Sequence, residues 1–97
     1  MSLEELLVAA VRRGSLADVE GIVDTDKVDI NATDRWGLTP LMEAVCHNEV
    51  EIIRFLLEHG ADPMLKTTSG TTALGLAGAE ARAAIERWMR RRARLSS

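Results

Sequence analysis

A motif that returns after 33 residues constrains the fold of this chain more than any other feature. The stretch DRWGLTPLMEA, from Asp34 to Ala44, returns as TTSGTTALGLA from Thr67 to Ala77. A fixed period of this length is typical of proteins that stack copies of one small structural unit. The sequence therefore predicts a repeat protein, with identical residues at matching places in the two copies: Gly37 and Gly70, Thr39 and Thr72, Leu41 and Leu74, Ala44 and Ala77.

An earlier and more degenerate copy precedes these two at an offset of 34 residues. It lacks the glycine-containing turn, and only its apolar positions match the middle copy. It begins with Ser2 and Glu5 at the spacing of a capping box, which predicts a helix that starts cleanly there. The apolar positions of this copy are Leu7, Ala10, Val11, Leu16, Val19, Ile22 and Val23.

The middle copy contains start and stop signals for two short helices. Thr39 followed by Pro40 is typical of a helix start, because threonine caps free backbone N–H groups and proline tolerates the first helical position. Asn48 predicts the end of that helix and Gly60 the end of the next, because both residue types accept a left-handed backbone. The polar segment before them, residues 31–38, predicts an extended turn that projects from the helix pair.

These features together resemble the ankyrin repeat. The segment DRWGLTPLMEAVCHNEVEIIRFLLEHGADP carries the family's Gly-x-Thr-Pro-Leu opening, its internal alanine, its apolar second helix and its Gly-Ala-Asp ending. The resemblance implies an all-α solenoid of stacked helix-turn-helix pairs with projecting β-turns. We expect a single domain over residues 1–97, with repeats at about 3–33, 34–66 and 67–92 and a basic tail at 90–97.

The sequence departs from the family pattern in two ways. Members of the family usually have histidine after Thr-Pro-Leu, in a hydrogen-bonded position, whereas this chain has Met42 and Gly75. We therefore expect that polar tie to be absent and the repeats to be held together by packing. The third copy is one residue shorter near Gly78, which resembles a terminal cap.

Enzymatic chemistry is not expected, and neither is a cofactor or a metal site. Cys46, His47 and His59 are the residues that suggest catalysis, yet neighbouring helical residues point about 100° apart, so no triad follows. A lone cysteine indicates a reducing compartment. The longest apolar run is only six residues, and Glu4 and Glu5 stand where a signal peptide has basic residues, so we expect a cytoplasmic or nuclear location and no membrane insertion.

The resemblance implies a non-catalytic adaptor that binds another protein, whose identity the sequence does not give, through its concave face. Trp36 is the expected centre of this surface, because an aromatic beside an arginine is typical of interface hot spots. Two alternatives stay open: Trp36 covers the neighbouring turn, and Met42 fills the space of the missing histidine. The predicted partner-binding residues are Arg35, Trp36, Leu38, Met42, Glu43, Cys46, His47, Lys66, Ser69, Thr71, Arg12 and Arg13, with Val8 extending the surface.

The charge is divided unevenly along the chain, which suggests a lesser alternative function. Residues 1–78 carry 13 acidic and 6 basic side chains, whereas residues 79–97 carry 2 acidic and 6 basic ones. The arginines of the tail suit polyanion binding or nuclear localisation, or form a solvated helix end that favours the helix dipole. Nucleic-acid binding is not expected, because the acidic body repels it.

Self-association is the second alternative function. Three repeats are about the minimum for a continuous core, and two of the copies are irregular. We expect Leu3, Leu7 and Val11 to be partly uncovered at one end of the stack, while Trp88 and Met89 either join the core or face outward at the other end. The sequence therefore suggests a weak homodimer or a chain that docks onto a larger subunit.

Overall fold

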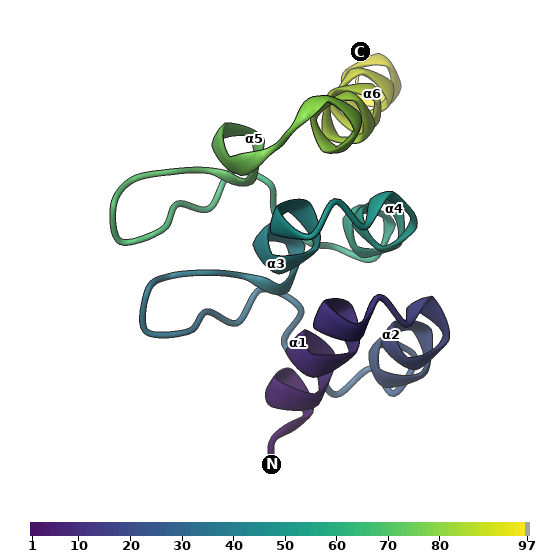
Figure 1. The fold of residues 1–97 in the computed structure, drawn as a ribbon. Helices are drawn as coiled ribbons and strands as arrows, with labels where there is room; N and C mark the ends of the chain where they lie inside the picture. Colours follow the sequence, from purple (N-terminus) through teal and green to yellow (C-terminus); the bar gives the residue numbers. More distant parts are fainter. Residues whose placement is uncertain (97) are drawn as a thin grey trace.

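The computed structural model describes residues 1–96 and shows three helix pairs stacked side by side (Figure 1). The predicted all-α ankyrin-type solenoid is confirmed, and its two longer loops project to the same side of the stack. Ser97, the last residue of the expected basic tail, lies outside the described residues. The helices are α1 (Leu3–Arg13), α2 (Leu16–Val23), α3 (Pro40–Cys46), α4 (Val50–Glu58), α5 (Ala73–Leu76) and α6 (Ala79–Ser96).

Helix α1 begins and ends where local sequence signals place its caps. The Ser2 side chain accepts a hydrogen bond from the backbone N–H of Glu5, and the Glu5 carboxylate accepts one from the backbone N–H of Ser2. Gly14 ends the helix with φ 71°, a left-handed conformation that costs glycine little. These caps set where α1 starts and how the chain turns into α2.

The middle helix pair, α3 and α4, is also bounded by residues whose local signals mark helix starts and ends. Thr39 caps α3 through a hydrogen bond from the backbone N–H of Met42 to its hydroxyl, and Pro40 occupies the first turn. Asn48 has φ 53° between α3 and α4, and Gly60 has φ 103° just after α4. The helix boundaries predicted from Thr39, Asn48 and Gly60 are therefore confirmed.

The core lies between an inner layer of α1, α3 and α5 and an outer layer of α2, α4 and α6 (Figure 1). Leu7 and Val11 are both 0% exposed, so the expectation that they are partly uncovered is wrong. Both residues lie on the side of α1 that packs against α2 and α3. Leu3 is half-buried, in agreement with the expectation, and Leu6 is 40% exposed.

The two projecting loops stack on each other. The backbone N–H of Thr68 in the second loop donates to the backbone carbonyl of Trp36 in the first, at 2.9 Å. Gly37 makes this approach feasible, because a Cβ atom there would lie 3.0 Å from the backbone of Thr67 and Thr68. Lys66 and Thr72 form an antiparallel bridge that closes the second loop.

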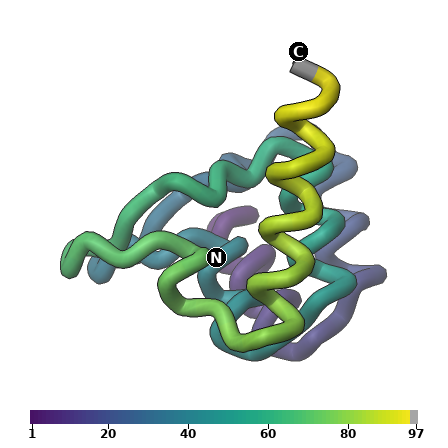
Figure 2. Tube along the Cα trace, turned by 90° about the horizontal axis from the view of Figure 1, so that it is seen from above, coloured from purple at the N-terminus to yellow at the C-terminus, as the bar shows by residue number. Residues whose placement is uncertain are grey.

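The two helices of the third pair differ in length. Helix α5 has 4 residues and α6 has 18, and the C-terminal part of α6 extends past the other helices (Figure 2). Ile85 is buried, whereas Trp88 and Met89 are half-buried and pack against the core. The arginine-rich tail is thus a continuation of α6, at least as far as Ser96.

Polar contacts also join the repeats, so cohesion does not rest on packing alone. The Asn31 side chain donates to the carbonyl oxygen of Gly60 and accepts from the backbone N–H of Asp62. Asn48 donates to the Glu80 carboxylate across the next interface.

Within residues 1–96, no helix is long and apolar enough to cross a membrane.

Candidate functional site

A hollow of about 360 Å³ lies between α1 and the first projecting loop. We call it the α1 hollow. One wall is the exposed face of α1, and the other is the loop leading into the start of α3. The residues lining the α1 hollow are Met1, Glu4, Glu5, Val8, Ala9, Arg12, Ala32, Thr33, Asp34, Leu38, Pro40 and Glu43.

Helical spacing gathers the α1 residues of this hollow on one face. Glu4, Val8 and Arg12 follow one another at intervals of four residues, and Glu5 and Ala9 lie next to this row. Residues four apart are neighbours on a helix surface. Leu7 and Val11 point into the core from a neighbouring face of α1, whereas Val8 and Ala9 are only half-buried.

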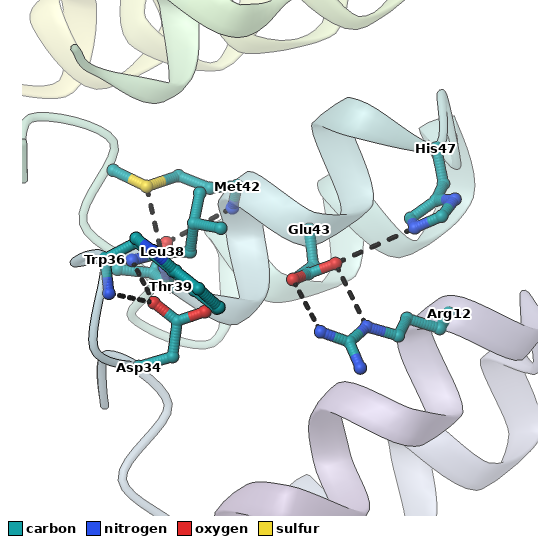
Figure 3. A network of polar contacts seen from close by, with 8 residues as sticks. All are labelled: Arg12, Asp34, Trp36, Leu38, Thr39, Met42, Glu43 and His47. Carbon is teal, nitrogen blue, oxygen red and sulfur yellow. Dashed lines mark hydrogen bonds and ion pairs between the residues drawn. The ribbon is translucent and has the colours of Figure 1, made fainter. Parts of the chain in front are cut away.

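An ionic network closes the hollow where α1 meets α3. The Arg12 guanidinium donates to both Glu43 carboxylate oxygens, at 3.3 and 3.1 Å, and His47 Nε2 lies 3.7 Å from Glu43 Oε2 (Figure 3). The hydrogen bond to Glu43, together with its charge, raises the pKa of Arg12 above its ordinary value. Because Arg12 is largely exposed, we expect this pair to contribute no more than about 1 kcal/mol.

Trp36 stands on the first loop and is 56% exposed. The guanidinium of Arg35 lies 4.7 Å from the centre of its ring. The Asp34 carboxylate fixes the loop by accepting the backbone N–H groups of Trp36 and Leu38, each at 2.9 Å (Figure 3). The Trp36 backbone therefore contacts the neighbouring loop, whereas much of its side chain is available to a partner.

Met42 does not lie on the surface, contrary to the prediction. Its side chain is 1% exposed, and its sulfur accepts a hydrogen bond from the backbone N–H of Thr39 at 3.5 Å (Figure 3). A flexible thioether fills irregular space, so the gap-filling alternative agrees with the structure. The expectation that the local polar tie is absent also needs correction, because the sulfur accepts this hydrogen bond.

Glu43 is a second predicted surface residue that is mostly covered, at 8% exposed. Its carboxylate pairs with Arg12 and lies 3.7 Å from His47. A partner at this place would therefore contact the exposed Arg12 and His47 side chains more than Glu43 itself. Arg13 is exposed but pairs with Asp18 of α2 at 2.9 Å, which directs it away from α3. Arg13 therefore belongs to its own helix pair more than to the hollow.

The remaining predicted residues lie along the exposed ends of α3 and the second loop. Cys46 and His47 are exposed at the end of α3. Partial burial, together with the nearby Glu43 charge, raises the pKa of the Cys46 thiol, which leaves it protonated and weakly nucleophilic at neutral pH. On the second loop, Lys66 and Ser69 are exposed and Thr71 is half-buried.

Several residues of the hollow were not among the predicted partner-binding residues. Glu4, Glu5 and Ala9 come from α1, and Thr33 and Asp34 come from the first loop. The signal for the α1 residues is present in the sequence, because they share a helix face with Arg12. The loop residues carry no such signal, since only the folded chain shows that they face α1.

The chain also matches known proteins. A family model described as ankyrin repeats (3 copies) matches residues 6–89. The chain is 40% identical over 73 residues to the 2-5A-dependent ribonuclease of Mus musculus, a match that covers 74% of this chain and 10% of the relative. It is 43% identical over 56 residues to palmitoyltransferase akr1 of Schizosaccharomyces pombe, with 58% and 9% covered.

A third relative is ankyrin repeat family A protein 2 of Homo sapiens, with 48% identity over 48 residues, covering 50% of this chain and 15% of the relative. The chain therefore spans only 9% to 15% of the length of these three relatives. Their names include two enzymes, and the similarity covers a small part of each. The family model, in contrast, spans most of this chain, which therefore belongs to the ankyrin-repeat family.

Proposed function

We propose that this chain is a non-catalytic protein-interaction module that binds a segment of another protein on its concave face. Ankyrin repeats generally mediate protein–protein interaction, and repeat proteins of this kind present extended concave surfaces. The observation that carries the proposal is the α1 hollow, one wall of which belongs to the same loop as the exposed Trp36. This loop thus offers a partner both a recess and an exposed aromatic side chain.

The loop is suited to this role because it is held in place before a partner arrives. Asp34 fixes the loop from within, and the bond from Thr68 to the Trp36 carbonyl fixes it to the second loop. A preorganised surface loses little conformational entropy on binding. Trp36 can therefore contribute its contact area without first ordering the loop.

The test uses peptides selected from a random display library for binding to the intact chain. Replacing Trp36 with alanine should reduce the binding free energy of the selected peptides by about 2 kcal/mol, which is a roughly thirtyfold loss of affinity. Exposed aromatics at interfaces are typical hot spots. Affinities would be measured by calorimetry, and circular dichroism would check that the helices are unchanged.

Leu95→Ala is the matched control, because Leu95 is also a large exposed apolar residue but lies near the end of α6. The proposal predicts unchanged affinity for this variant. Equal affinities for Trp36→Ala and the parent chain would contradict the assignment of Trp36 as the anchor. A library that yields no binder above background would contradict the module function itself.

A further inference from the structure

The α1 hollow carries a surplus of negative charge. Four carboxylates line it, those of Glu4, Glu5, Asp34 and Glu43, against two cationic groups, the guanidinium of Arg12 and the amino group of Met1. Arg12 and Glu43 pair with each other. Three carboxylates thus remain around the hollow without a basic side chain among its lining residues.

These three carboxylates are held in place through one oxygen each. Glu4 Oε2 accepts the backbone N–H of Asp29 at 2.8 Å, and Glu5 Oε1 accepts that of Ser2 at 3.0 Å. Asp34 Oδ1 accepts the two N–H groups within its own loop. In each case the second carboxylate oxygen is not used by these bonds. The hydrogen bonds from Ser2 also lower the pKa of Glu5, which keeps it ionised at neutral pH.

Between the carboxylates lies apolar surface. Val8, Ala9 and Leu38 are half-buried, and Pro40 is buried beside them, whereas Glu5 and Asp34 are exposed. The hollow therefore combines recessed aliphatic groups with more exposed carboxylates. This arrangement suits a side chain that has an aliphatic stem and a cationic head, because lysine and arginine bury their stems on apolar surface while the charge stays near water.

We propose that the α1 hollow receives a lysine or arginine side chain of the bound protein segment. The inference rests on the proposed function and adds the chemistry of the partner: a basic segment, with its stem on Val8, Ala9 and Leu38 and its charge near Glu4, Glu5 and Asp34. Charge complementarity across an interface selects partners and speeds their association. An anionic lipid surface or a nucleic acid is disfavoured at this position by the same carboxylates.

The test uses N-acetyl-lysine methylamide as a probe, followed by nuclear magnetic resonance of the isotopically labelled chain. N-acetyl-norleucine methylamide, which has the same stem without the charge, is the matched ligand. We expect lysine to shift the amide signals of Val8, Ala9 and Leu38 in a saturable manner. Its affinity should exceed that of norleucine at least about threefold in low salt, and the difference should shrink at about 0.5 M salt.

A variant without these three charges distinguishes the effect of the carboxylate charge on binding from the effect of the shape of the hollow. Amides keep an oxygen that accepts the same backbone bonds, so replacing the three acids with their amides should preserve the caps and the loop. The lysine preference should disappear in this variant and persist in a control that neutralises three exposed acids of the outer helices. The test variant is Glu4→Gln, Glu5→Gln and Asp34→Asn, and the control is Glu20→Gln, Glu51→Gln and Glu58→Gln.

Two outcomes would overturn the inference: equal affinity for lysine and norleucine probes, or a lysine preference that survives the loss of all three hollow charges. Neither would affect the proposed function, whose test is the effect of Trp36→Ala on selected peptides. Conversely, a lysine-specific hollow in a chain that selects no peptide would support the binding chemistry and contradict the module function. The two claims therefore fail separately.

Discussion

Replacing Leu41 with alanine is expected to lower the free energy of unfolding by about 3 kcal/mol. Leu41 is 0% exposed and lies on α3, which packs against α1, α4 and α5. The substitution removes a large buried side chain from a helix that packs against three others, and the stacked layers leave little freedom to collapse onto the cavity. A chain of this length has roughly 5 to 15 kcal/mol of stability in total, so the loss is a large fraction.

Thermal and urea unfolding of the variant provide the measurement. We expect the melting temperature to fall by roughly 10 to 20 °C, in a single transition, because α3 is central to every repeat interface. Leu95→Ala is the control, since Leu95 is 82% exposed and its truncation should change stability by no more than about 0.5 kcal/mol. Similar small effects at both positions would show that α3 is not the centre of the core.

Replacing Gly37 with alanine is expected to cost about 2 to 3 kcal/mol. Two effects add at this position: the residue has φ 79°, and its new Cβ atom would lie 3.0 Å from the Thr67 and Thr68 backbone. The neighbouring loop must move away, which breaks the bond between Thr68 and the Trp36 carbonyl. We therefore expect loss of stability together with a changed environment for the Trp36 ring, visible in its fluorescence.

Gly70→Ala separates backbone strain from loop stacking. Gly70 has φ 85°, but a Cβ atom there would meet nothing within 4 Å, so only the strain of about 1 kcal/mol is expected. The two variants are compared by their free energies of unfolding in urea. The difference gives the energetic cost of disturbing the close contact between the two loops. If Gly70→Ala and Gly37→Ala cost the same, the stacking of the two loops would contribute nothing.

Local signals predicted the helix boundaries well because each depends on a few adjacent residues. Thr39 caps its own helix, and Asn48 and Gly60 adopt left-handed conformations at the ends of theirs. The resemblance of the motif then supplied the way the pairs stack. The capping box of Ser2 and Glu5 was predicted for the same reason, since both partners lie within one turn.

The position of individual side chains in the stack was harder to predict. Met42 follows the helix start in sequence, but whether its sulfur turns inward depends on how Thr39 and the next repeat surround it. Leu7 and Val11 were expected to be partly uncovered because the first copy is terminal, yet their stripe lies between helices. Burial at these positions is a property of the packed arrangement and not of the local pattern.

The α1 hollow was not predicted as a whole because it joins two segments that lie far apart in the sequence, with Glu4 and Asp34 separated by 30 positions. Asp34 belongs to the first loop and Glu4 to α1, and no periodicity links them. Half of the hollow follows from the helical spacing of Glu4, Val8 and Arg12. The other half depends on where the loop lies relative to α1, which the sequence pattern does not specify.

Hydrogen–deuterium exchange of the chain with and without a selected peptide tests the central claim most directly. If the concave face binds the partner, the peptide should slow exchange in α1 and in the loop over residues 31–38, which together contain the α1 hollow and Trp36. The outer helices α2 and α4 should exchange as in the free chain. Protection confined to α2, α4 and α6, with the loop and α1 unchanged, would contradict the account.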